Sequence, residues 1–178
     1  MPRIDHARIL IMATDGFEES ELFGPRAILK ERGAEVKLAS PSLTPIQATV
    51  LDDPGRTIRP DLSIAEAKVG DFDALVLPGG VINPDALRAN RVAVELVKAF
   101  VAARKPVAAI CHGPWLLVEA DVLHGRTATG WKSIRTDLRN AGASLSDERV
   151  VSDDGIITAQ APEDVETFTA ALIDALQP

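Results

Sequence analysis

Cysteine is nearly absent from this sequence: Cys111 is the only one among 178 residues, and there are only three histidines. A single cysteine cannot form an internal disulfide, which fits a reducing compartment such as the cytoplasm. It also excludes a cysteine-based zinc site, and so few histidines argue against a histidine-rich metal site. We therefore expect neither a bound metal nor a cofactor.

Positive charge and long hydrophobic runs are also scarce. The 19 Lys and Arg residues are outnumbered by 26 Asp and Glu residues, which gives a net charge of −7 and a pI near 5.0. This balance, without a basic cluster, argues against a nucleic-acid-binding protein. No apolar run is long enough to span a bilayer, and no N-terminal segment has signal-peptide form. We expect a cytoplasmic protein that binds neither nucleic acid nor a membrane.

Short apolar runs alternate regularly with amphipathic stretches, and the length and 46% hydrophobic content fit a single domain over residues 1–178. This alternation predicts a mostly parallel sheet covered by helices on both faces. Strands are expected at 8–13, 35–39, 73–77 and 107–110, with short strands around 46–51 and a hairpin of 150–152 with 156–159. Helices are expected at 18–32, near 64–68, at 92–103, 115–120 and 133–141, and from Pro162 onward.

Three loops are expected to lie together, because ligands of such sheets bind beyond the carboxyl ends of the strands. The loops are 14–21, 78–84 and 111–114. The last one contains the single cysteine, so this edge of the sheet is the predicted site.

Cys111 stands where the strand at 107–110 ends, just before the helix at 115–120. Unpaired amides and the helix dipole favour a thiolate there, and the thiolate is the reactive form. Gly113 is small, as a sharp nucleophile elbow requires. A lone cysteine is most often a buried small hydrophobe, but this placement favours a nucleophile. His112 could accept the thiol proton or stabilise the thiolate; the alternative is a histidine that points away.

Gly79 and Gly80 follow Pro78 at the end of a predicted strand. Their amides, with the amide of His112 or Gly113, could form an oxyanion hole, and the alternative is an ordinary turn. Trp131 could line a substrate pocket, although core packing is the simpler interpretation.

Carboxyl groups also occur near the predicted site. Glu18, Glu19 and Glu21 open the first helix, where acidic residues usually face solvent and interact with the helix dipole. The alternative is a carboxyl held near the thiolate, with a raised pKa and a hydrogen bond to sulfur. Asp85 could cap a helix, or it could orient His112 as the third member of a nucleophile–base–orienter set.

Four segments together resemble the DJ-1/PfpI superfamily, on the branch of the PfpI-like intracellular proteases and general stress proteins. Their order and spacing make the match specific over nearly the whole chain. The segments are 15–22 (DGFEESEL), 73–80 (DALVLPGG), 109–114 (AICHGP) and 130–134 (GWKSI).

The resemblance implies a flavodoxin-like α/β fold, a three-layer sandwich with a mostly parallel sheet. It implies that Cys111 is the elbow nucleophile, that His112 follows it as in the family, and that Glu21 is the helix carboxyl beside the sulfur. In PfpI-like members an acidic residue of a neighbouring subunit completes the triad, and the matching position is Asp85. The chain is therefore expected to form a homo-oligomer, a dimer or a hexamer.

The resemblance leaves three functions open, all of which use the thiol. The first is an enzyme acting on small reactive carbonyls or their adducts, as glyoxalases and deglycases do. The second is an intracellular cysteine peptidase, and the third is a redox-sensing or chaperone-like stress protein without turnover. We favour the first, with Glu18, Gly79, Gly80, Gly113 and Trp131 around the substrate.

Overall fold

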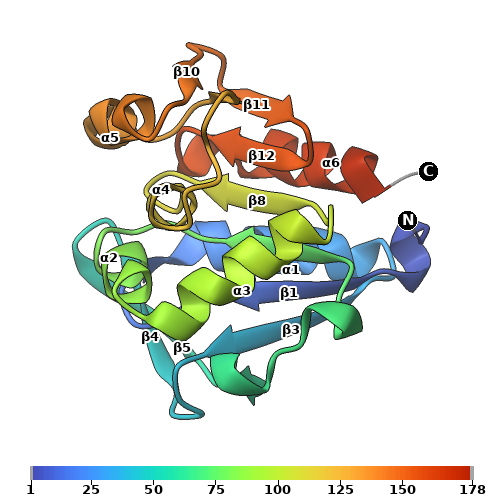
Figure 1. The fold of residues 1–178 in the computed structure, drawn as a ribbon. Helices are drawn as coiled ribbons and strands as arrows, with labels where there is room; N and C mark the ends of the chain where they lie inside the picture. Colours follow the sequence, from blue (N-terminus) through green and yellow to red (C-terminus); the bar gives the residue numbers. More distant parts are fainter. Residues whose placement is uncertain (1, 177–178) are drawn as a thin grey trace.

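The computed structural model, which describes residues 2–176, is a three-layer α/β sandwich in which one large sheet separates two layers of helices (Figure 1). The flavodoxin-like fold class predicted from the sequence is confirmed. In the described part of the chain, no helix has the length and apolar character needed to cross a membrane.

The large sheet has seven strands, and all neighbouring pairs are parallel except the pair at one edge, which is the predicted hairpin. Their order across the sheet is β11 (Val150–Asp153), β12 (Ile156–Ala159), β8 (Val107–Ile110), β7 (Ala74–Leu77), β1 (Arg8–Met12), β3 (Glu35–Ser40) and β6 (Leu62–Ser63).

Two small sheets lie outside the large one: β2 (Phe17–Glu18) with β4 (Ile46–Val50) and β5 (Asp53–Ile58), and β9 (Thr127–Ala128) with β10 (Ser144–Leu145). The strand near 46–51 was expected, whereas β5 was not, because Pro54 and Gly55 are typical of loops. β5 forms as an antiparallel partner of β4, and the amide of Arg56 donates to the Glu19 carboxylate at 2.6 Å.

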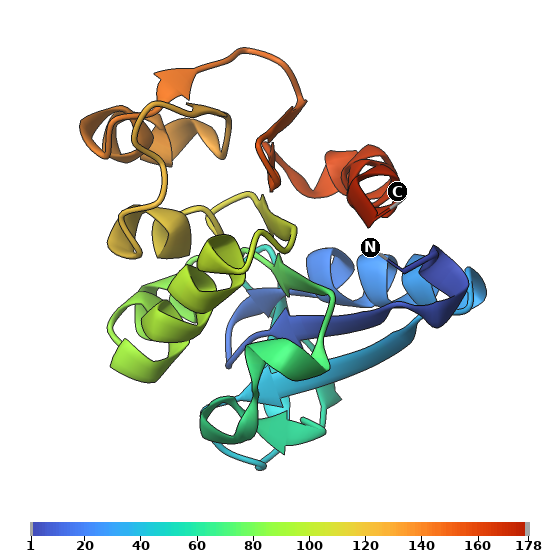
Figure 2. The same ribbon diagram turned by 45° about the vertical axis from the view of Figure 1, so that its right-hand side comes forward.

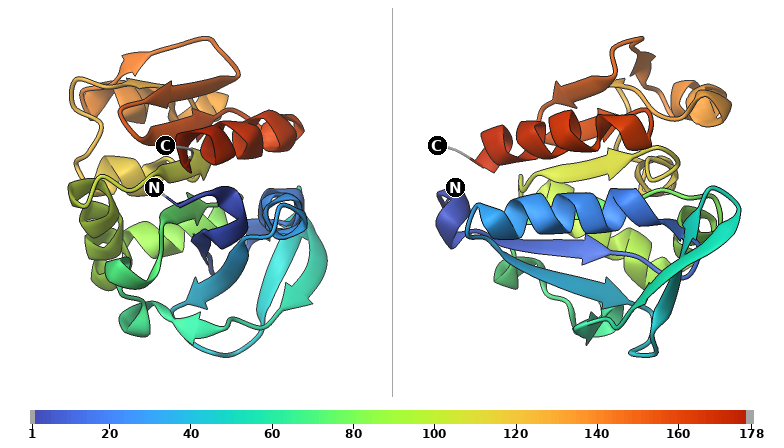
Figure 3. Two further views of the ribbon diagram at one scale, coloured as in Figure 1. Left: turned by 90° about the vertical axis from the view of Figure 1, so that its right-hand side faces the viewer. Right: turned by 180° about the vertical axis from the view of Figure 1, so that it is seen from behind.

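Helices α1 (Glu19–Glu31) and α6 (Val165–Leu176) lie side by side on one face of the sheet, as seen from behind in Figure 3. The opposite face carries the other layer, whose helices lie on the left of Figure 2, across the sheet from α1. This layer contains α2 (Ile82–Arg88), α3 (Arg91–Ala102), α4 (Trp115–Glu119) and α5 (Arg135–Asn140). Short 3-10 turns complete the described chain: Ile4–His6, Ile64–Glu66, Val69–Asp71, Lys132–Ile134 and Pro162–Asp164.

β1 shows how the sequence specifies two cores. Ile9 and Ile11 point into the core beneath α1 and α6, whereas Leu10 and Met12 point into the core beneath the other layer. All four are fully buried, and each contributes about 1.5–3 kcal/mol by leaving water. A strand covered on both faces must be apolar at every position, which explains the uninterrupted run in the sequence.

The parallel arrangement brings three loops to one edge. β1, β7 and β8 are adjacent, so the segments after their carboxyl ends meet: 13–18, 78–81 and 111–114. This is the edge at which the sequence predicted the site.

Candidate active site

Cys111 occupies a strained elbow directly after β8. Its φ is +61°, the left-handed region that non-glycine residues seldom adopt. The amide of Cys111 donates to Ala159 O at 3.0 Å and the amide of Gly113 donates to Ile110 O at 2.8 Å, which closes the turn. A side chain at Gly113 would collide with the backbone oxygen of Leu77. The local backbone is therefore a sharp, strained turn directly after the strand, the geometry that a nucleophile elbow requires.

Two backbone amides stabilise negative charge on the sulfur. Burial raises the pKa of the Cys111 thiol, and the backbone amides of His112 and Gly80, which face the sulfur, oppose that rise. Gly80 has a φ of +76°, and a side chain there would collide with Gly16 O. Only glycine brings this amide so close to the sulfur.

The other two amides suggested for an oxyanion hole are engaged elsewhere. The amide of Gly79 donates to Oε2 of Glu21 at 2.7 Å, and that of Gly113 donates to Ile110 O. As placed, neither is free to bind a substrate oxygen. Of the four amides that the sequence suggested, those of Gly80 and His112 are the two that face the sulfur of Cys111.

Glu21 lies on the first turn of α1 with none of its surface exposed. Burial, reinforced by the nearby charges of Glu18 and Glu163, raises the pKa of Glu21 to about 8, against the hydrogen bond from Gly79. Its Oε1 has no hydrogen-bond partner among the described residues. At neutral pH this carboxyl is protonated, so it can donate a hydrogen bond to a thiolate of Cys111.

The thiol itself is almost enclosed, with 6% of Cys111 exposed. Burial raises the pKa of the Cys111 thiol, and an ionised Glu21 would raise it further. The resting state is therefore a neutral thiol beside a neutral carboxyl. To become a thiolate, the thiol must transfer its proton to a base.

His112 is the candidate base that lies next to the thiol. Its Nδ1 lies 3.3 Å from Sγ of Cys111, and its Nε2 lies 3.1 Å from Oγ of Ser133. The ring centroid lies 5.2 Å from that of Trp115 and 6.0 Å from that of Trp131, so two aromatic rings pack near the imidazole. Burial lowers the pKa of His112, which keeps it neutral and able to accept a proton at pH 7.

The remaining predicted residues lie around this centre at different distances. The Trp131 amide donates to Cys111 O at 2.9 Å, and its ring flanks His112. Glu18 accepts a hydrogen bond from the Leu51 amide at 3.1 Å, and burial raises its pKa.

Asp85 does not join the centre within one chain. It lies in the first turn of α2, exposed, and it is not the capping residue that the sequence suggested. Within residues 2–176, the hydrogen bonds and ion pairs of His112 do not include Asp85. The place at Nε2 of His112 is taken by Ser133.

Sequence reasoning missed two residues of the site. The first is Ser133, which lay inside the GWKSI segment but read only as the start of a helix. The second is Asn83, which is fully buried and joins two of the loops. Its Oδ1 accepts from the amide of Thr14 at 2.8 Å, and its Nδ2 donates to Pro78 O at 2.9 Å and Gly79 O at 3.0 Å.

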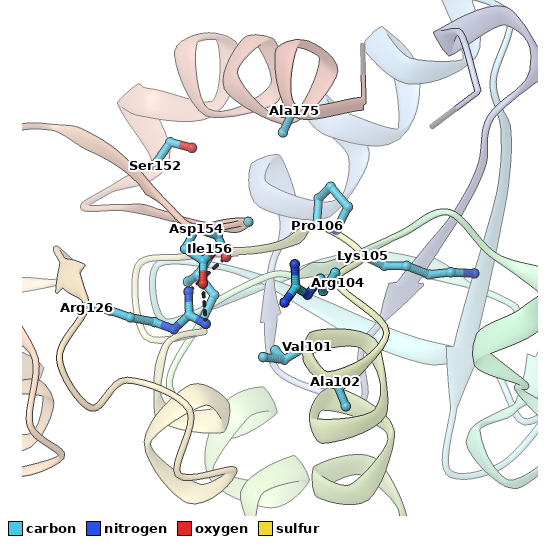
Figure 4. Close-up of a pocket in the computed structure, with 11 residues that line it drawn as sticks. Val101, Ala102, Arg104, Lys105, Pro106, Arg126, Ser152, Asp154, Ile156 and Ala175 are labelled. Atoms are coloured by element: carbon cyan, nitrogen blue, oxygen red, sulfur yellow. Dashed lines mark hydrogen bonds and ion pairs between the residues drawn. The ribbon is translucent and has the colours of Figure 1, made fainter. Parts of the chain in front are cut away.

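A cavity of about 580 Å³ lies at the opposite edge of the sheet, at the amino ends of β8 and β12 (Figure 4). Arg126, which lines it, bonds to Asp154 through the backbone oxygen at 2.8 Å and the carboxylate at 3.0 Å. Lys105 donates to Val69 O at 2.7 Å instead of facing the cavity. Two of the cationic side chains beside the cavity are thus paired within the protein. Among residues 2–176, no three His, Cys, Asp or Glu side chains are arranged to hold a metal ion.

Comparison with known proteins gives a family match that includes all four segments on which the resemblance was based. A model described as the DJ-1/PfpI family matches residues 7–175. The chain is 41% identical to general stress protein 18 of Bacillus subtilis and 39% identical to a deglycase of Pyrococcus abyssi, covering 96% of this chain and 98% and 99% of theirs. It is also 39% identical to YraA of Bacillus subtilis, named provisionally as a cysteine protease, over 96% and 98% of the two chains.

A solved structure shows the same fold. The DJ-1/ThiJ/PfpI-like domain of a two-domain protein from Anabaena variabilis, which also has a ferritin-like domain, superposes with a TM-score of 0.91 at 34% identity. The match covers 96% of this chain and 48% of that one.

Proposed function

The chain belongs to the DJ-1/PfpI family, and we propose that it is a cofactor-independent enzyme whose Cys111 attacks small reactive carbonyl compounds or their adducts. One observation carries this proposal. Sγ of Cys111 lies 3.3 Å from Nδ1 of His112 at a left-handed elbow, which is the geometry of a nucleophile with its base. Relatives named as a deglycase and as a general stress protein support carbonyl defence as the role.

The enclosure of the thiol supports a small substrate. Cys111 is 6% exposed and His112 is 7% exposed, so only a compact electrophile reaches the sulfur without a rearrangement of the surrounding loops. A two- or three-carbon dicarbonyl such as methylglyoxal meets this requirement. A segment of folded polypeptide does not.

The proposed reaction with methylglyoxal needs only proton transfers and water. Sγ bonds to the aldehyde carbon while the thiol proton passes through His112 to the aldehyde oxygen, giving a hemithioacetal. The proton on that carbon moves through His112 to the neighbouring carbonyl carbon, and the hydroxyl proton moves to its oxygen. The product is a lactoyl thioester, formed without an external oxidant. Water hydrolyses it to lactate and restores the thiol.

The surrounding groups stabilise charge during these steps. The amides of Gly80 and His112 stabilise the attacking thiolate, and the protonated Glu21 carboxyl lies beside it. A neutral acid near the sulfur avoids the repulsion that an ionised carboxylate would create.

Conversion of methylglyoxal to lactate tests the proposal. The purified protein should produce lactate, and Cys111→Ser should reduce the rate to the uncatalysed background. Ser152→Ala removes an exposed hydroxyl on the distant strand β11 and should leave the rate unchanged. Equal background rates in the wild type and Cys111→Ser would reject carbonyl turnover.

A peptidase is the second candidate, favoured by the relative YraA. The same thiol would then form an acyl-enzyme with a peptide carbonyl, which requires an unfolded substrate strand to reach a nearly enclosed sulfur. Cleavage of an unfolded polypeptide that is lost in Cys111→Ala would support this activity.

We also propose a homo-oligomer in which Asp85 of one subunit approaches the active site of another. Asp85 is exposed on α2, and the adjacent Val81 and Ile82 are 56% and 62% exposed, an apolar surface suited to contact between subunits. The free thiol of the single cysteine fits a cytoplasmic location, which is part of the same proposal.

A further inference from the structure

We propose that Ser133 is a positioning residue that holds His112 in the tautomer with the proton on Nε2, so that the unprotonated Nδ1 faces the Cys111 thiol. One chain then contains a complete relay of thiol, imidazole and hydroxyl. This inference rests on the proposed function, which assigns proton transfer to His112.

The two hydrogen bonds of the imidazole define the relay. Oγ of Ser133 lies 3.1 Å from Nε2, and Sγ of Cys111 lies 3.3 Å from Nδ1. A neutral imidazole carries one N–H, and a hydroxyl can accept it. When Nε2 donates to Ser133, the lone pair of Nδ1 is directed at the thiol. In the opposite tautomer Nδ1–H would face the S–H group, and no base would be available.

The backbone fixes Ser133 relative to the nucleophile. The amide of Trp131 donates to Cys111 O at 2.9 Å, and the amide of Ile134 donates to Trp131 O at 3.0 Å. Ile134 is fully buried, which anchors the 3-10 turn Lys132–Ile134 that carries the serine. The hydroxyl is thus presented to His112 by a segment tied directly to the elbow.

Ser133 has no competing structural task among the described residues. It caps neither its own 3-10 turn nor α5, and its side chain contributes nothing to the cores. The hydrogen bond that the structure shows for its hydroxyl is the one to His112. An exposed serine used in this way can be replaced without a cavity or a lost cap.

The tautomer of His112 provides a test that does not depend on turnover. Imidazole ¹⁵N–¹H correlation spectra of the wild type at pH 7 should show His112 protonated at Nε2. The resonance can be assigned among three histidines by its loss in His112→Gln. Ser133→Ala should shift the population toward protonated Nδ1, and Ser133→Thr, which keeps the hydroxyl, should restore the wild-type spectrum.

Alkylation of Cys111 by iodoacetamide gives a second readout. Ser133→Ala should lower the rate at pH 7 by about 3–10-fold, as expected for loss of a neutral hydrogen bond, and Ser133→Thr should recover it. Ser152→Ala is the matched control and should react like the wild type. Protonated Nδ1 in the wild type, or an unchanged tautomer and unchanged alkylation in Ser133→Ala, would overturn the proposal. Absence of methylglyoxal turnover in the wild type would reject the proposed function alone.

Discussion

The buried carboxyl of Glu21 and the side chain of Cys111 meet where a side chain of Gly79 would otherwise lie. A Cβ placed on Gly79 would be 2.6 Å from Oε2 of Glu21 and 2.7 Å from Cβ of Cys111. Two acidic groups therefore share one buried site, where ionisation of both at once is strongly unfavourable. The protein keeps the carboxyl neutral and leaves the sulfur as the group that can acquire charge during reaction.

The stability of the protein should depend on pH through Glu21. Its folded-state pKa of about 8 lies above the ordinary value of 4.5, so between these values the folded state binds more protons than the unfolded state. The contribution is fully present below pH 4.5 and is lost as pH rises through about 8. Glu21→Gln should remove this loss. The free energy of unfolding of the variant should therefore rise relative to that of the wild type by up to about 1.4 kcal/mol per pH unit.

Urea unfolding between pH 5 and pH 8 measures this difference. Glu31→Gln changes an exposed carboxyl at the other end of α1 and should follow the wild-type curve. Parallel stability curves for Glu21→Gln and the wild type would show that Glu21 is ionised in the folded protein.

Gly79 should tolerate no side chain. Gly79→Ala places a methyl group against both Glu21 and Cys111, and neither can retreat within a packed interior. We expect a loss of about 1–3 kcal/mol in the free energy of unfolding and slower alkylation of the thiol.

Gly70→Ala is the matched control, because a methyl group there would meet nothing within 4 Å. Both variants can be compared by thermal melting and iodoacetamide kinetics. Equal stability of the two would mean that the backbone at Gly79 can move away from the sulfur.

The elements that the sequence predicted well are those that neighbouring residues specify by themselves. The run at β1 is apolar on both faces, and the hairpin of β11 and β12 has a turn sequence of its own. β5 was missed because an edge strand is specified by its partner β4, which local residue preferences do not reveal. Cys111 was found because its environment follows from the order of strand and helix.

The contacts within the site were harder to predict. Gly79 and Gly80 look equivalent in sequence, yet one amide bonds to Glu21 and the other to the sulfur, because the φ of Gly80 turns its peptide around. Ser133 and Asn83 bond to residues 21 and 69 positions away in the chain. Such pairings depend on where the strands place their loops, and spacing along the chain does not encode them.

Replacement of Asn83 should lower both the stability of the protein and the reactivity of the Cys111 thiol. Asn83→Ala removes hydrogen bonds to Thr14, Pro78 and Gly79 and leaves buried backbone groups without partners. The oxygen of Gly79 still accepts from the amide of Glu18 at 3.4 Å, so two groups lose their partner. At about 1–3 kcal/mol for each of them, we expect a total loss of about 2–6 kcal/mol. The segment carrying Gly80 should also loosen, which should slow alkylation of Cys111. Asn140→Ala, at the exposed end of α5, should change neither quantity. If the thiol of Asn83→Ala reacted as fast as that of the wild type, the loop held by Asn83 would have no influence on the reactivity of Cys111.

Asp85 should affect catalysis only in an assembled protein. If the carboxylate of a second subunit orients His112, Asp85→Asn should lower carbonyl turnover by about tenfold or more without changing the stability of one chain. The exposed acid Glu95 on α3 provides the control Glu95→Gln. Turnover per subunit should also fall when the wild type is diluted until it dissociates, as followed by light scattering. Full activity in Asp85→Asn would remove this residue from the mechanism.

Ser133 and Asp85 should interact in a double-mutant cycle if both act through Nε2 of His112. That nitrogen carries one hydrogen in the neutral ring, so it donates to one acceptor at a time. The hydroxyl already occupies this position at 3.1 Å in the single chain. The remaining acceptor should then compensate in part for each single loss, so Ser133→Ala with Asp85→Asn should lose more turnover than the product of the two separate losses. Strictly multiplicative losses would mean that the carboxylate acts on another group, and that the hydroxyl alone orients the imidazole.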